Sequence, residues 1–280
     1  MTPWVIISLA LVTWTMGNAS ITDKPEDVVD NNIPPATAKT IVETAVEEIM
    51  ETGELNPNHY PARRAANVVQ HYINSRYGSP FKVFILHEVH SGNSEDVANS
   101  GRKYQLEISV QEMLSNSTHK CTAEVLFPRG ERQGPPEVQV SCEELEKLNT
   151  TKEDEALYQK LKTRTSMLSA QNLPDSHGRI DPEMKPLRHL GIVASSFIML
   201  QESNENTLYN MAQIGNVTQL ATKADELKFD YFVLLHDMVS QEILRWNLQI
   251  SWSPQEGVKI LQQEKLPHCH ECKVPPAIRE

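Results

Sequence analysis

The chain has 280 residues, of which 39% are hydrophobic and 22% are charged. This length suits one large domain or two small ones, and the composition is that of a globular protein rather than a disordered or membrane-embedded one. Acidic side chains outnumber basic ones, 37 to 26, which gives a net charge of -11. Nucleic-acid binding depends on Lys and Arg neutralising phosphates, so this charge argues against DNA or RNA as a partner.

The start of the chain has the features of a secretory leader. Residues 1–20 carry no charge, and the stretch from Trp4 to Trp14 is apolar but too short to span a bilayer. Small residues in "GNAS" at 17–20 suit signal peptidase. We therefore predict a signal peptide at 1–19 and a secreted, extracellular protein without a membrane span after cleavage. The alternative is a buried strand or helix at the start of the fold.

After the leader, residues 20–57 predict an acidic N-terminal extension. Its segment "ATAKTIVETAVEEIM" has the pattern of an amphipathic helix, with Pro-rich and acidic flanks.

One segment of the chain is repeated. "KYQLEISVQEM" begins at Lys103 and "KFDYFVLLHDM" begins at Lys228, an offset of 125 residues. Pro61 and Pro186 share this offset, and so do apolar residues at helical spacing upstream and alternating residues downstream. Upstream, Ala65, Val68, Val69, Tyr72 and Ile73 match Leu190, Val193, Ala194, Phe197 and Ile198. Downstream, Cys121, Ala123, Val125 and Phe127 match Trp246, Leu248, Ile250 and Trp252.

Each repeat predicts a helix followed by about four antiparallel strands, with the helix across the concave face of the sheet. The apolar residues Tyr104, Leu106, Ile108 and Val110 alternate with polar ones, which is typical of a half-buried strand. We therefore expect an α+β fold of two tandem subdomains, at 58–142 and 174–262. A linker at 143–173 contains a helix over "EDEALYQKLKTRTSMLSAQN", with Leu157, Leu161 and Leu168 at helical spacing, and a tail follows at 263–280.

Two pairs of cysteines fit an oxidising compartment. When the hairpin around "PRGERQGPP" is folded about its centre, Val125 pairs with Val138, Ala123 with Val140, and Cys121 with Cys142. We predict a disulfide between Cys121 and Cys142, the alternative being two free buried thiols. Cys269 and Cys272 lie in "HCHEC", for which a local disulfide is favoured over a zinc site because no second ligand pair exists.

Motifs for catalysis are missing. "HEVH" places His87 and His90 three residues apart, and on a regular strand this spacing sends them to opposite faces, so they cannot chelate one ion. The sequence has neither a glycine-rich phosphate loop nor a G-x-S-x-G motif. We therefore expect a binding protein rather than an enzyme, with no metal and no cofactor. Sequons at Asn18, Asn116, Asn149 and Asn216 add candidate glycosylation sites.

The segments "NHYPARRAANVVQHYINSRYGSPFKVF", "KCTAEVLFP", "QNLPDSHGRIDPEM" and "LLHDMVSQEILRWNLQISW" resemble the latexin family, from about Asn58 to Ile260. The leader and cysteines make the chain more similar to the secreted branch of that family. The resemblance implies two cystatin-like subdomains packed through their helices. It also implies inhibition of A/B-type zinc metallocarboxypeptidases, with the enzyme bound at the junction of the subdomains.

A carboxypeptidase has a funnel that an inhibitor either enters with its C-terminus or caps at the rim. The tail ends in "PPAIRE", whose terminal Glu280 suits an apolar pocket poorly, so capping is favoured. The second repeat has outward Phe232 and Leu234 beside Asp230 and His236, and an apolar outward face needs a partner. A glycan at Asn116 would keep a partner off the first hairpin tip, whereas the matching tip of the second repeat has Gln241 at that position and would carry no glycan. The residues expected to contact the enzyme are therefore His236, Asp237, Met238, Val239, Ser240, Gln241 and Glu242.

Two other functions remain open. A cystatin-like fold can inhibit papain-type proteases through a QxVxG hairpin and a Pro-Trp turn. The corresponding segments here, "HEVHSG" at 87–92, "AQIGNV" at 212–217, Phe127-Pro128 and "SWSP" at 251–254, fit poorly. Acidic runs such as "SCEELEKL" and "TTKEDEAL" would suit an eggshell-type or mineral-associated matrix protein, although such runs are more often solvated helix faces.

Overall fold

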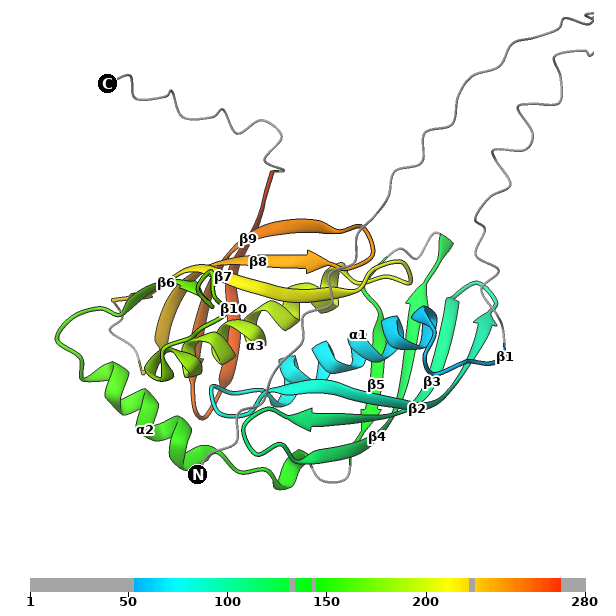
Figure 1. The fold of residues 1–280 in the computed structure, drawn as a ribbon, viewed down its shortest axis with the longest axis horizontal. Coiled ribbons are helices and arrows are strands. Elements are labelled where there is room, and N and C mark those ends of the chain that lie inside the picture. Colours follow the sequence, from blue (N-terminus) through cyan, green and yellow to red (C-terminus); the bar gives the residue numbers. More distant parts are fainter. Residues whose placement is uncertain (1–52, 131–133, 143–144, 222–224, 268–280) are drawn as a thin grey trace, which may run out of the picture. The chain divides into compact units, whose positions relative to one another are not determined.

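The computed structural model describes residues 53–130, 134–142, 145–221 and 225–267 (Figure 1), which all belong to one compact unit, Ile49–Glu280. The predicted leader, the helix of the N-terminal extension, Asn18 and the "HCHEC" segment lie outside the described residues. Within the described part of the chain, no helix is long and apolar enough to cross a membrane.

The fold is α+β, with two antiparallel sheets of five strands, as the repeat predicts. The first sheet has the order β1-β2-β3-β4-β5 and is covered by helix α1; the second has the order β10-β9-β8-β7-β6 and is covered by α3. The first repeat contains β1 (Gly53–Glu54), α1 (Tyr60–Tyr77), β2 (Phe84–Val97), β3 (Gly101–Glu112), β4 (Thr118–Pro128) and β5 (Glu137–Ser141). The linker contains the short 3-10 helix η2 (Leu145–Lys147) and α2 (Thr151–Lys162). The second repeat contains β6 (Ser169–Leu173), η3 (Pro182–Met184), α3 (Lys185–Glu202), β7 (Tyr209–Leu220), β8 (Leu227–Asp237), β9 (Glu242–Ser253) and β10 (Gly257–Leu266).

The two repeats correspond in backbone detail. Helices α1 and α3 each have 18 residues and begin at Tyr60 and Lys185, which preserves the offset. The β2–β3 pairing shifts register between Leu86 and Glu88 and again after Val89, and the β7–β8 pairing shifts at the same two places of the second repeat. The correspondence ends at the last strand. Val138 pairs with Val125 in the first repeat. The corresponding Gln263 pairs with Leu248 and not with Ile250, which is the counterpart of Val125.

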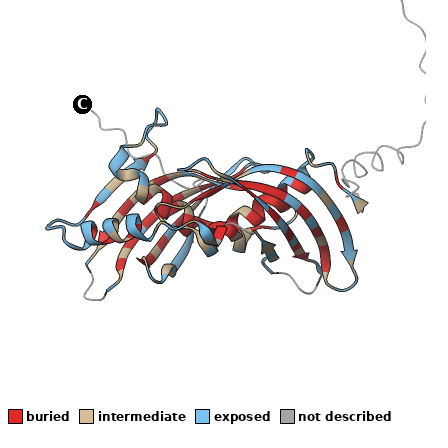
Figure 2. Cartoon of the chain, turned by 90° about the horizontal axis from the view of Figure 1, so that it is seen from below, coloured by how far each residue is buried: buried red, intermediate tan, exposed pale blue. Residues whose placement is uncertain are grey.

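Each core lies between a helix and the facing side of its sheet. The predicted inner residues of β3, Tyr104, Leu106, Ile108 and Val110, are all buried, and red and pale blue alternate along the strands in Figure 2. Helices α1 and α3 each have a proline in the first turn, where its missing N–H removes no intrahelical hydrogen bond. Four of the five predicted residues in α1 and in α3 are buried, whereas Tyr72 and Phe197 are half-buried. Both helices also bury residues that were not predicted, such as His71 and Ser195.

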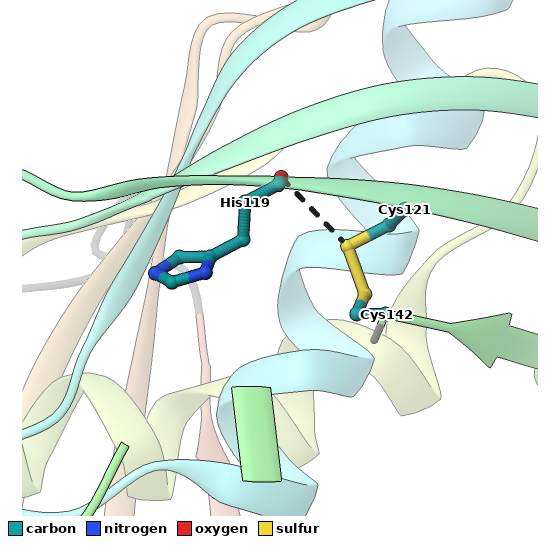
Figure 3. Close-up of a disulfide and its surroundings, with 3 residues drawn as sticks. All are labelled: His119, Cys121 and Cys142. Carbon is teal, nitrogen blue, oxygen red and sulfur yellow. Dashed lines mark hydrogen bonds between the residues drawn. A yellow bond between two sulfur atoms is a disulfide. The ribbon is translucent and has the colours of Figure 1, made fainter. Parts of the chain in front are cut away.

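The predicted disulfide closes the β4–β5 hairpin. Ala123 pairs with Val140 and Val125 with Val138, and the disulfide joins Cys121 to Cys142 just beyond the paired residues. The two Cα atoms lie 4.4 Å apart, within the range of ordinary disulfides. Figure 3 shows the sulfur of Cys121 beside the carbonyl oxygen of His119, at 4.0 Å.

The linker differs from its prediction. Helix α2 ends at Lys162, where the hydroxyl of Thr163 binds the carbonyl of Gln159, so the helix does not reach Leu168. Leu168 is buried in the second core, directly before β6. Strand β6, placed in the linker by the sequence, joins the second sheet, and β10 extends into the predicted tail as far as Leu266.

The two subdomains contact each other through α1 and α3, which lie side by side (Figure 1). Arg64 of α1 donates to the carbonyl of Glu205 at 3.2 Å, and the Nδ1 atom of His189 of α3 lies 2.8 Å from the carbonyl of Pro80. These contacts are equivalent, because 64 and 189, like 80 and 205, are related by the repeat offset. The Nε2 atom of His71 adds a third bridge, 3.1 Å from the carbonyl of Tyr209.

Candidate partner-binding site

The residues predicted to contact an enzyme form the turn between β8 and β9. We call residues 236–242 the second tip, and the corresponding residues 111–117 between β3 and β4 the first tip. In the second tip Asp237 and Glu242 pair at the end of the hairpin, and Gln241 has a left-handed backbone with φ of 61°. Its side chain donates to the carbonyl of Met238 at 2.6 Å. The turn is therefore a folded structure held by its own hydrogen bonds.

The carboxylate of Asp237 organises the second tip. The residue is 5% exposed and accepts hydrogen bonds from the backbone N–H groups of Leu208 and Val239, at 3.0 and 3.1 Å, and from the Ser240 hydroxyl at 2.8 Å. Burial alone would raise the pKa of Asp237, but these hydrogen bonds hold it below its usual value. Asp237 therefore positions the turn, a role that the sequence did not predict, and its contact with a partner stays a prediction.

The first tip has the same scaffold with a different surface. Glu112 occupies the place of Asp237 and accepts from the N–H groups of Leu114 and Ser115, at 3.0 and 2.6 Å. Asn116 occupies the place of Gln241, with a similar φ of 57°. The two tips thus differ mainly in the side chains that they expose.

The second tip is the more apolar of the two. Among the described residues, eight large hydrophobic side chains are exposed, and three of them, Met238, Val239 and Ile243, lie at or next to the second tip. The first tip exposes only Leu114 of this group. Clustering of exposed apolar side chains is a feature of binding surfaces, so the geometry favours the second tip as a contact.

The outward face of β8 is partly covered by its own sheet. Phe232 and Leu234 are half-buried, as are the flanking residues of the strand on the same face apart from the exposed Asp230. A Cβ atom at Gly215 of β7 would lie 2.6 Å from the Phe232 ring, so this ring packs directly on the glycine. A depression of about 790 Å³ beside it has a polar rim that includes Asn216 and Asp230. Intramolecular packing therefore meets part of the need for a partner that the sequence suggested.

The histidines of "HEVH" lie on a bulged strand. The register of β2 shifts at both His87 and His90, and both residues are exposed. The opposite-face argument assumed a regular strand, and β2 is irregular at both of these residues. Across the described ranges, no three His, Cys, Asp or Glu side chains lie close enough to hold a metal ion.

The segments compared with papain-type inhibitors do not lie where such an inhibitor presents its wedges. Residues 87–92 and 212–217 lie in the middle of β2 and β7 and not at hairpin turns, which corrects their assumed position. Trp252, in the place of the Pro-Trp turn, is only 1% exposed in the second core. The two strand segments and Trp252 therefore differ in position from the wedges of a papain-type inhibitor.

One of the acidic runs is partly turned inward. Asp154 of "TTKEDEAL" is 6% exposed and accepts from the Thr150 hydroxyl at 2.7 Å. Burial raises the pKa of Asp154, although the hydrogen bond from Thr150 opposes this effect. This helix is therefore not a uniformly solvated acidic face.

Sequence reasoning missed a polar bridge at the subdomain junction. The Glu205 carboxylate accepts two hydrogen bonds from Arg129, at 2.7 and 3.0 Å, and one from the Tyr104 hydroxyl at 3.2 Å. Burial and the nearby carboxylate raise the pKa of Tyr104. No local pattern marked Arg129, which lies in the turn-rich hairpin segment and is 76 residues from Glu205.

The chain is similar to known proteins over most of its described length. Residues 55–270 match the family described as Latexin. Latexin of Mus musculus is 40% identical over 215 residues, which cover 76% of this chain and 97% of the relative. Retinoic acid receptor responder protein 1 of Homo sapiens is 31% identical, covering 76% of this chain and 73% of that protein. Ovocalyxin-32 of Gallus gallus is 30% identical, covering 82% of each. Together with the two helix-on-sheet repeats, these matches show that the chain belongs to the latexin family.

Proposed function

We propose that this chain is a secreted inhibitor of A/B-type zinc metallocarboxypeptidases and that the second tip caps the rim of the enzyme's active-site funnel. In this role the chain has no catalytic group of its own and needs no cofactor. Membership of the latexin family supports an inhibitor. The resemblance of the quoted sequence segments to that family implies this class of enzyme as the target.

One observation carries the proposal: the predicted contact residues form a folded turn with exposed apolar side chains. A turn fixed by Asp237 before binding loses less conformational freedom when a partner immobilises it. Met238 and Val239 are 45% and 41% exposed, and they supply apolar area at the centre of a contact. Gln241 and Glu242 are exposed beside them and supply polar groups for the rim.

The test is steady-state inhibition of an A-type metallocarboxypeptidase by the purified full chain, with papain as a parallel target. A Gln241→Arg, Glu242→Arg double variant should weaken inhibition by about tenfold or more, equivalent to about 1.4 kcal/mol. The matched control is Ser117→Arg, because residue 117 occupies in the first tip the place of Glu242, and this change retains the Asn116 sequon. It should leave inhibition unchanged.

The outcomes separate the function from its site. Inhibition that survives the double variant would retain the function and move the contact elsewhere. Equal loss with Ser117→Arg would contradict a one-sided contact. Absence of inhibition at micromolar concentration of the chain would overturn the proposal and favour an extracellular matrix role.

A further inference from the structure

One sequon asparagine lines a hollow beside the first tip, and a second lies next to its lining in the sequence. A hollow of about 290 Å³ lies between the first tip and the start of the linker, and Leu114 and Ser115 line it from the tip. Asn149 and Thr150 line it from the linker. Asn116 directly follows Ser115, so one candidate asparagine belongs to the lining and the other is the next residue along the chain from it.

Both asparagines are presented in a form that suits modification. Asn116 is exposed at the left-handed position of the first tip, where Gln111 donates to its backbone carbonyl at 3.4 Å. Asn149 is also exposed, and its side-chain oxygen accepts from the N–H of Thr151 at 3.0 Å. This bond uses the side-chain oxygen, so the amide nitrogen, which is the atom that carries a glycan, takes no part in it. The sequon threonines, Thr118 and Thr151, are exposed as well.

Asn216 differs from both. It lies within β7, which pairs with β6 on one side and β8 on the other, and it is half-buried. Its side-chain nitrogen donates to the hydroxyl of Thr218 at 3.3 Å, so the two groups of the sequon bind each other. Its register partner on β8 is Phe232, and both residues line the depression beside this strand, so its position within the strand and its bond to Thr218 distinguish it from the other two.

We propose that N-linked glycans on Asn116 and Asn149 together cover the hollow at the first tip, and that Asn216 is left unmodified. In each modification the amide nitrogen forms a bond to the anomeric carbon of a lipid-pyrophosphate-linked oligosaccharide. The bond between that carbon and the pyrophosphate oxygen breaks, the lipid pyrophosphate leaves, and the amide gives up one proton. No oxidant or reductant takes part.

The consequence is a molecule with two similar tips, of which one is shielded. The hollow contains the exposed apolar Leu114, and glycans on these two asparagines would exclude other proteins from it. The inference requires entry into the secretory pathway but does not depend on the proposed enzyme target.

The experiment expresses the full chain with its own leader in vertebrate cells. Enzymatic removal of N-glycans in heavy-oxygen water converts each formerly modified Asn to labelled Asp, which peptide mass spectrometry locates. We expect label at Asn116 and Asn149 and none at Asn216. Loss of label at either of the first two sites, or label at Asn216, would overturn the proposal, as would a chain without any glycan.

Matched variants connect each glycan to its sequon. Thr118→Ala and Thr151→Ala should each increase electrophoretic mobility by one glycan, whereas Thr118→Ser and Thr151→Ser should not. Thr218→Ala should leave mobility unchanged. Thr151→Ala also retains the backbone N–H that binds Asn149, so it removes the sequon without removing that hydrogen bond.

Shielding has its own readout. Ser115→Cys and Ser240→Cys place a thiol at equivalent positions of the two tips, and the parent chain serves as the blank. Enzymatic deglycosylation should increase the rate at which a bulky maleimide labels Ser115→Cys several-fold and leave the rate for Ser240→Cys unchanged. An equal response of the two variants would contradict the shielding.

Discussion

The buried His71 at the subdomain junction makes the stability of this fold sensitive to acid. Complete burial lowers the pKa of His71 from 6.5 to about 4, and the hydrogen bond to the Tyr209 carbonyl opposes this shift only in part. As the pH falls below 6.5, the unfolded chain takes up a proton at this residue that the folded chain does not. The free energy of unfolding therefore decreases with falling pH until the folded imidazole is itself protonated.

The size of the effect follows from the shift. One pKa unit corresponds to about 1.4 kcal/mol, so the full window corresponds to about 3 kcal/mol, of which about 2 kcal/mol is lost by about pH 5. His189 on the other helix acts in the same direction, because burial also lowers its pKa. Since both histidines form hydrogen bonds to the opposite subdomain, the loss of stability at low pH weakens the contact between the two subdomains.

The assay is urea unfolding at about pH 7.5 and about pH 5, at constant ionic strength, for the parent, His71→Gln and His87→Gln. A glutamine at position 71 retains a donor for the Tyr209 carbonyl but does not titrate. His87 is exposed, and its replacement by glutamine removes one imidazole that lies outside the subdomain contacts. His71→Gln should lose about 2 kcal/mol less than the parent between the two pH values, and His87→Gln should behave as the parent. Equal losses in parent and His71→Gln would refute the reasoning.

Three further predictions concern stability. Replacement of Glu205 by Gln removes the charge that Arg129 binds, and we expect a loss of about 1–3 kcal/mol in urea unfolding, with no change contradicting a bridge between the subdomains. The Cys121→Ser, Cys142→Ser double variant should lose about 3 kcal/mol, and reduction of the parent should give the same midpoint. A Cβ atom at Gly78 would clash with the backbone oxygen of Asn74 and lie 2.6 Å from a methyl group of Val193, so Gly78→Ala should lower the thermal midpoint through a loss of about 1–3 kcal/mol, and an unchanged midpoint would contradict this close packing.

The sequence predicted the elements that depend on local period. Strict alternation around Leu106 determines which face of the strand is buried, and that face is buried as expected. Helical spacing after Pro61 marked most of the buried apolar residues of α1 but not Arg64 and His71, which are buried in contact with the second subdomain. The Cys121–Cys142 disulfide was predictable because a hairpin with a central turn has one symmetric register.

Features that depend on long-range contact were not predictable in this way. Strand β6 reads as linker because its residues are mostly polar and exposed, with only Leu173 buried, as suits a sheet edge. The bulges of β2 break the alternation that placed His87 and His90. For the second tip, the sequence identified the turn but not the buried role of Asp237, because an acidic residue in a turn is usually exposed.

Each of the helices α1 and α3 contacts the segment that follows the other helix, and these reciprocal contacts have the pattern of an isologous dimer within one chain. Arg64 reaches the carbonyl of Glu205, while His189 at the equivalent position reaches the carbonyl of Pro80. In a symmetric homodimer one residue type must satisfy both copies of such a contact. Covalent joining of the two halves removes that constraint, so one contact uses a permanent cation and the other a titratable imidazole. The two equivalent contacts therefore share a backbone arrangement but differ in their response to acid, because only the His189 side chain titrates in that range.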